Sequence, residues 1–124
     1  MTRIFISLAA ILGGLSVAAG AFATHALRAR LSDRALEIFE TATRYQMYHA
    51  ITLLVVALLL SRSESQFALL AGGWAFIVGI IIFSGSLYAL SLTDIKILGA
   101  ITPLGGAAFI VGWLCLAYAG LSFK

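Results

Sequence analysis

Four long stretches of this sequence contain no charged side chain. They cover residues 4–27, 45–61, 65–93 and 97–123. A helix needs about 20 mostly apolar residues, within a range of about 17–25, to cross the hydrocarbon core of a bilayer. Each stretch reaches that length, and residues 53–60 are apolar on all sides, unlike the alternating strands of a membrane barrel. The sequence therefore predicts four transmembrane helices.

Composition excludes the soluble alternatives. Hydrophobic residues make up 62% of the 124 residues and charged residues only 10%, with a mean hydropathy of +1.08. A soluble chain this small has too much surface to hide so many apolar side chains. Intrinsic disorder is excluded as well, because disordered chains have low hydrophobicity and many charges. The single cysteine, Cys115, excludes an intramolecular disulfide and a cysteine-based metal cluster. We expect an all-α fold, an integral membrane four-helix bundle that forms one domain over residues 1–124.

More than half of the charges belong to one segment. Seven of the thirteen charged residues are Arg28, Arg30, Asp33, Arg34, Glu37, Glu40 and Arg44. We therefore expect spans at about residues 4–25, 45–61, 67–90 and 100–122, with a charged extramembrane segment at about 26–44.

The second helix is expected to begin inside the charged segment. Ser32 is suited to cap its N-terminus, and Asp33 would follow in the first turn, where the helix dipole favours an acid. Glu40 and Arg44 are spaced for an i,i+4 ion pair. A helix over residues 33–61 would be about 43 Å long and would exceed the ~30 Å hydrocarbon core. Its first turns would extend beyond the bilayer, or lie along its surface if the helix breaks near Tyr45.

The first span has some features of a cleaved secretory signal. Arg3 precedes an apolar core, and Ala21-Phe22-Ala23 imitates a cleavage site. Cleavage would leave a three-helix remnant without the small residues Gly13, Gly14 and Gly20. We expect this span to be retained.

The fourth stretch contains the only proline. Pro103 is tolerated at the first position of a helix, where its missing N–H costs nothing, and Thr102 would then be the N-cap. Residues 95–101 would form a loop or a short extra turn. The alternative is one longer helix that is kinked at Pro103.

Lysine and arginine are unevenly distributed between the two sides of the bundle. With four spans, one side carries Arg3, Arg62 and Lys124, and the other carries Arg28, Arg30, Arg34, Arg44 and Lys96. The positive-inside rule places the side with more of them in the cytoplasm, with both termini outside.

Glycines recur at helical intervals in three of the stretches. The pairs are Gly13 and Gly20, Gly72 and Gly79, and Gly105 and Gly112. An interval of seven residues returns to almost the same helix face, and small residues let helices in lipid approach closely. We expect these six glycines to be helix-packing residues.

A candidate polar site lies beside the charged segment. It comprises His25, Tyr45, Gln46, Tyr48 and His49. Ionisable groups at membrane depth are functional candidates, and both histidines are expected toward the same membrane face and at similar depth. They could relay a proton, or ligate a haem iron or another metal. A structural role at the interface, with hydrogen bonds to carbonyls or tyrosines, is the stronger interpretation.

Signatures of catalysis are missing from the sequence. It contains no nucleophile–histidine–acid arrangement, no phosphate-binding loop and no carboxylate at the centre of a span. A basic patch with interleaved aromatics, as a nucleic-acid-binding protein would need, is absent too. We predict no catalytic residue, no metal site and no cofactor, with membrane lipid as the surroundings.

Several blocks together resemble a known family. They are residues 20–27 (GAFATHAL), 39–50 (FETATRYQMYHA), 85–88 (GSLY) and 102–106 (TPLGG), with Gly112-Trp113. They are similar to the bacterial membrane family called domain of unknown function 423, whose eukaryotic relatives are the transmembrane protein 256 family. Thr24 departs from the small residue expected there. The resemblance implies a multi-pass protein of the bacterial inner membrane and supplies no biochemical activity.

Three functional hypotheses follow. The first is a non-enzymatic structural, assembly or interaction subunit, which would associate as a homo-oligomer or with a membrane protein partner. The second is a carrier or channel for a small ligand, ion or lipid that uses His25 and His49 at one membrane face. The third is a haem-binding or metal-binding membrane protein that uses the same two histidines.

Overall fold

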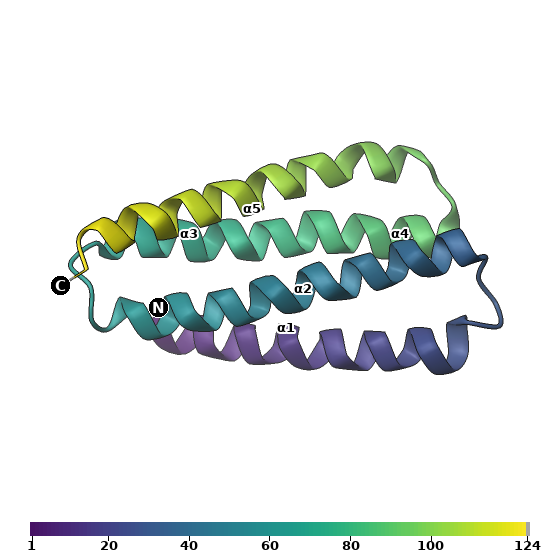
Figure 1. Ribbon diagram of the computed structural model, residues 1–124, viewed down its shortest axis with the longest axis horizontal. Coiled ribbons are helices and arrows are strands. Elements are labelled where there is room, and N and C mark those ends of the chain that lie inside the picture. Colours follow the sequence, from purple (N-terminus) through teal and green to yellow (C-terminus); the bar gives the residue numbers. More distant parts are fainter. Residues whose placement is uncertain (124) are drawn as a thin grey trace.

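The computed structural model describes residues 1–123, which form four long antiparallel helical spans (Figure 1). The first span joins α1 (Thr2–Phe22) to a π-helical turn, η1 (Ala23–Leu27), and the second is α2 (Asp33–Leu60). The third joins α3 (Gln66–Gly79), a second π-helical turn, η2 (Ile80–Ser84), and α4 (Gly85–Thr93); the fourth is α5 (Ile97–Leu121). All four are long and apolar enough to cross a membrane, which confirms the expected all-α membrane bundle. Lys124, counted above for orientation, lies outside the described residues.

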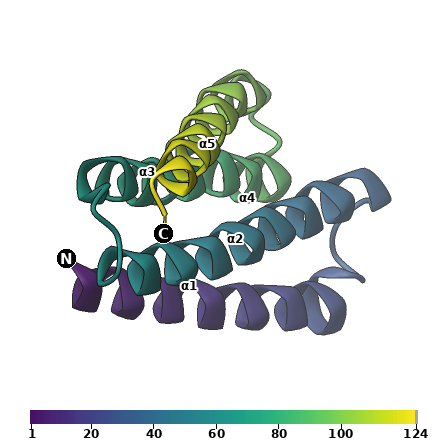
Figure 2. The ribbon, with the colours of Figure 1, turned by 60° about the vertical axis from the view of Figure 1, so that its left-hand side comes forward.

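The spans are arranged with two helices inside and two outside. α1 packs mainly against α2, α2 packs against α3, η2 and α4, and α5 lies tilted across the outer side of that third span (Figures 1 and 2). In the most apolar part of each span, about 50% of the residues of the two inner spans are buried, against 17% in the outer ones. α1 and α5 therefore each leave a wide apolar face for lipid or for another protein.

Apolar packing fills the bundle from both ends. The larger core cluster includes Phe5, Leu53, Leu69 and Phe76, all of which are buried almost completely. A smaller cluster around Phe39 joins the end of the first span to the charged turns of α2. Those charged turns are thus packed within the bundle along one side, even though α2 is longer than a hydrocarbon core.

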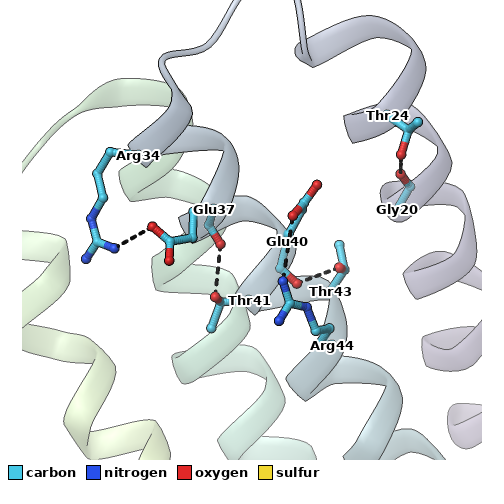
Figure 3. A network of polar contacts seen from close by, with 8 residues as sticks. All are labelled: Gly20, Thr24, Arg34, Glu37, Glu40, Thr41, Thr43 and Arg44. Carbon is cyan, nitrogen blue, oxygen red and sulfur yellow. Dashed lines mark hydrogen bonds and ion pairs between the residues drawn. The ribbon is translucent and has the colours of Figure 1, made fainter.

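The local expectations for α2 are confirmed. The Ser32 hydroxyl accepts a hydrogen bond from the backbone N–H of Ala35 at 3.1 Å, as an N-cap should. Arg44 pairs with Glu40 at 3.6 Å, and Arg34 pairs with Glu37 at 2.9 Å (Figure 3). Both pairs are exposed, and such i,i+3 and i,i+4 pairs contribute only about 0.3–0.5 kcal/mol in water. The helix continues without interruption through Tyr45, so the alternative of a break there is wrong.

The cap offers a direct test of how α2 begins. Ser32→Ala should destabilise the bundle by about 1 kcal/mol, because an N–H of the first turn loses its acceptor. Ser32→Asp should retain most of the stability, since aspartate caps equally well. Unfolding of detergent-solubilised protein by titration with sodium dodecyl sulfate, followed by circular dichroism, measures both effects. Equal losses in the two variants would contradict the capping role.

The expected helix start at Pro103 is wrong. α5 begins at Ile97, so Pro103 lies inside the helix, and one longer helix is formed. The Thr102 hydroxyl is no cap; it lies 2.6 Å from the Ser86 hydroxyl and 3.2 Å from the Leu98 carbonyl oxygen. A helix satisfies backbone groups that lipid cannot, so the apolar segment before Pro103 gains by remaining helical.

Four of the six predicted packing glycines lie at close helix contacts. A methyl group added at Gly79, Gly105 or Gly112 would overlap a phenylalanine of the neighbouring span, and one added at Gly72 would press on α5. The other two are different, because a Cβ added at Gly13 would meet only the Met47 sulfur at 4.0 Å, and one added at Gly20 would have no neighbour within 4 Å. Gly20 is therefore not a close-packing residue, because a methyl group there would meet no atom of the neighbouring helix.

Candidate polar site

α2 carries four of the five residues of the predicted polar site, and it turns them in two directions. Gln46 and His49 are each only 5% exposed and point into the bundle. Tyr45 and Tyr48 are exposed on the outer side. The helix therefore separates the group into a buried polar pair and two surface aromatics.

Hydrogen bonds determine the protonation state of His49. Its Nδ1 lies 2.7 Å from the carbonyl oxygen of Tyr45, and its Nε2 lies 3.1 Å from the indole Nε1 of Trp113. An indole N–H can only donate, so Nε2 must accept, and the ring proton must be on Nδ1, which donates to Tyr45. The geometry thus fits a neutral imidazole with both nitrogens engaged.

Aromatic rings enclose the imidazole. The Phe109 ring stacks on it with a centroid separation of 3.5 Å and an interplanar angle of 6°. Phe76 lies with its centroid 5.6 Å away, and Trp113 meets the imidazole edge-on at 6.0 Å. Such flat, apolar surroundings suit an uncharged ring, and through them His49 joins α2 to α3 and α5.

Gln46 joins three spans through its single amide group. Its Nε2 donates to the carbonyl oxygen of Leu12 on α1 at 2.8 Å, and its Oε1 accepts from the Tyr88 hydroxyl on α4 at 2.7 Å. Serines reinforce the same level of the bundle, where Ser16 donates to the Thr43 carbonyl and Ser84 to the Ala42 carbonyl. Hydrogen bonds between helices are a principal means of association where lipid surrounds the helices.

His25 belongs to a different part of the molecule. Because Gln46 bonds to Leu12 and Thr43 to Ser16 in this antiparallel pair, His49 lies level with about Ala9 on α1. His25 is sixteen residues further along, which corresponds to about 24 Å at 1.5 Å per residue. The expectation that both imidazoles lie at similar depth and share one face is wrong, and His25 is exposed.

The buried polar groups satisfy one another. Among residues 1–123, no buried side-chain nitrogen or oxygen is without a hydrogen-bond partner, and no three metal-ligating side chains are grouped. A metal could reach His49 only if Trp113 or Tyr45 gave up its bond. The polar groups of this site therefore hold the helices together through hydrogen bonds.

An apolar groove opens on the outer side of the same level. It has a volume of about 670 Å³ and lies between α2 and α5, with Phe83 of η2 also in its wall. We call it the aromatic groove; it is lined by Tyr45, Tyr48, His49, Phe83, Pro103, Gly106, Ala107, Phe109, Ile110 and Trp113. A volume of roughly 300–1,000 Å³ is typical of ligand sites.

Sequence reasoning missed the partners of the polar pair. Trp113 and Tyr88 are not among the residues of the predicted polar site, yet they supply the hydrogen bonds to His49 and Gln46. Gly73 was missed as well, although a methyl group there would overlap the Phe5 ring. The available signal was that a Trp or Tyr within an apolar span needs a hydrogen-bond partner for its polar atom.

Comparisons with known proteins are consistent with this fold. A family model described as "Protein of unknown function (DUF423)" matches residues 19–106. The UPF0382 membrane protein SERP0230 of Staphylococcus epidermidis is 47% identical over 121 residues, and YwdK of Bacillus subtilis is 45% identical over 121 residues; each match covers 98% of both chains. The UPF0382 membrane protein SAB0533 of Staphylococcus aureus is 44% identical over the same length. No solved structure matches this chain.

Proposed function

This chain belongs to the DUF423 family of membrane proteins, and we propose that it serves as a non-enzymatic interaction subunit of the bacterial inner membrane that binds another transmembrane helix through α1. Its relatives carry only the name of membrane proteins, so the proposal rests on the geometry of this chain.

The uncovered face of α1 is the observation that carries the proposal. Ala10, Gly14 and Ala18 are exposed and lie four residues apart, so they form one line along the side away from α2. Gly14 has no neighbour within 4 Å. Small residues at this spacing let a second helix approach closely enough for backbone packing, which drives association in lipid.

The use of the interior polar groups supports a non-enzymatic role. Both ring nitrogens of His49 are engaged, one with Trp113 on α5 and the other with the Tyr45 carbonyl of its own helix, and the Gln46 amide bonds to α1 and α4. A catalytic or transport group would have to present a polar atom to a substrate.

The excess of lysine and arginine near the start of α2 supports an orientation with that end in the cytoplasm.

Native sizing tests the association. Solubilised in mild detergent and measured by light scattering after gel filtration, the protein should migrate as a complex, with a second copy or with a membrane protein partner. Gly14→Leu should weaken the complex at least about tenfold, a change of about 1.4 kcal/mol, because the added side chain holds the helices apart.

Gly85→Leu is the matched control. Gly85 is also an exposed helical glycine with no neighbour within 4 Å, but it belongs to the third span. This variant should leave the complex unchanged. A monomer without any partner, or an equal effect of the two variants, would count against an interface on α1.

A further inference from the structure

Two hollows follow the same side of α2. The aromatic groove is the larger, and a polar hollow of about 280 Å³ lies nearer to the charged end of the bundle. The polar hollow lies between α2 with its preceding loop and the end of α4; it is lined by Arg30, Leu31, Ser32, Arg34, Ala35, Ile38, Leu90, Ser91 and Asp94.

The two hollows are lined by the same faces of α2 and of the third span. On α2, Ile38 of the polar hollow lies seven residues before Tyr45 of the groove, and on the third span Phe83 lies seven residues before Leu90. Seven residues make almost two full helical turns, so each pair lies on one helix face. The Cα atoms of Arg34 and Tyr45 are about 16 Å apart along the helix axis at 1.5 Å per residue.

Charge distinguishes the polar hollow from the groove. It combines two guanidinium groups, those of Arg30 and Arg34, with the carboxylate of Asp94. Figure 3 shows Arg34 and its partner Glu37 directed to the side of α2 away from α1, whereas Glu40 and Arg44 lie on another side. Within residues 1–123, Arg30 and Asp94 form no ion pair, so both charges are available to a ligand.

This combination matches one kind of lipid headgroup. A guanidinium binds phosphate through paired N–H donors, and a carboxylate accepts hydrogen bonds from a primary ammonium. A trimethylated ammonium has no N–H to donate, and a headgroup with only a phosphate would place its negative charge beside Asp94. The aromatic groove, which lies farther from the charged end of the bundle, is apolar and faces the surrounding lipid, where an acyl chain would be found.

We propose that the two hollows together bind one phospholipid with a primary ammonium headgroup, of the phosphatidylethanolamine class. Its phosphate lies against Arg30 and Arg34, its ammonium contacts Asp94, and one acyl chain occupies the aromatic groove beside Tyr45. The bound lipid would cover the seam between α2 and α5, which side chains such as His49 and Trp113 bridge.

Native mass spectrometry of the detergent-solubilised protein tests the proposal. Phosphatidylethanolamine, phosphatidylcholine and phosphatidylglycerol with identical acyl chains are added at equal concentration. One phosphatidylethanolamine should bind per chain, at least about tenfold more tightly than either competitor, the size expected for one net hydrogen bond to a charged group. Equal binding of the three lipids, or no discrete stoichiometry, would overturn the proposal.

Variants separate the headgroup from the chain. Asp94→Asn should reduce phosphatidylethanolamine binding to the level of phosphatidylcholine, and Arg34→Gln should weaken both. Ala107→Trp, an exposed position inside the groove, should weaken all three lipids together by filling the space for the chain. Lys96→Gln, an exposed charge outside the hollow, is the control and should change nothing. If the unmodified protein prefers phosphatidylglycerol and Asp94→Asn retains that preference, the hollow is a general anion site and the proposal is wrong.

Discussion

Replacing Gly105 with alanine should destabilise the bundle by about 1–3 kcal/mol, the usual range for an overpacked core. A Cβ at Gly105 would overlap the backbone nitrogen and Cα of Phe83 in η2, and a backbone cannot turn aside as a flexible side chain can. The two spans would have to separate along their contact. The better helix propensity of alanine, up to about 1 kcal/mol, offsets only part of that cost.

Gly106 provides the matched control one residue away. A Cβ there would lie 3.9 Å from the ring of Phe83, which is an ordinary contact. Gly106→Ala should therefore be neutral or slightly stabilising. Titration with sodium dodecyl sulfate, monitored by circular dichroism, gives the free energy of unfolding of both variants. Equal stabilities would mean that α5 and η2 do not touch at Gly105.

Replacing His49 with alanine should cost about 3 kcal/mol or more, as the loss of a buried aromatic ring usually does. The substitution removes the ring that Phe109 stacks on, and it leaves the Trp113 indole without its acceptor. His25→Ala should change the stability by less than about 0.5 kcal/mol, because His25 is exposed. The same titration compares the two variants.

A third variant separates the hydrogen bond from the packing. Trp113→Phe retains an aromatic ring but removes the N–H donor to His49, and it should cost about 1 kcal/mol. In a Trp74→Phe background, the fluorescence of Trp113 alone should shift when His49 is replaced by alanine and stay unchanged in His25→Ala. Similar effects of His49→Ala and His25→Ala would instead support one polar site that contains both histidines.

Much of the fold could be predicted because its signals are local. The distribution of charges located four spans, and Ser32 and the Glu40–Arg44 pair were predicted from spacing within one helix. The seven-residue intervals identified Gly72, Gly79, Gly105 and Gly112 because a periodic small residue marks a helix face. Each of these inferences needs only neighbours within two turns of the chain.

The wrong expectations all depended on how one helix lies against another. Gly20 has the same interval as the packing glycines, but the spacing along α1 does not show how closely the neighbouring helix approaches, and a Cβ at Gly20 would have no neighbour within 4 Å. The chemistry of Pro103 alone favours a helix start, whereas α5 begins at Ile97 and packs against the third span on both sides of the proline. Depth was misjudged for His49 because a charge-free stretch does not indicate the offset between antiparallel helices.

The sequence by itself determined that this chain crosses a membrane four times, since the cost of placing charge in hydrocarbon depends only on where the charges occur along the chain. It also determined the Ser32 cap and the Glu40–Arg44 ion pair, which depend on spacing within one helix. Only the tertiary structure decided that His49 bonds to Trp113 and Gln46 to Leu12 and Tyr88, and that His25 lies apart from them. The physical reason is that these contacts join residues up to 64 positions apart, and their partners follow from the rotation and offset of packed helices.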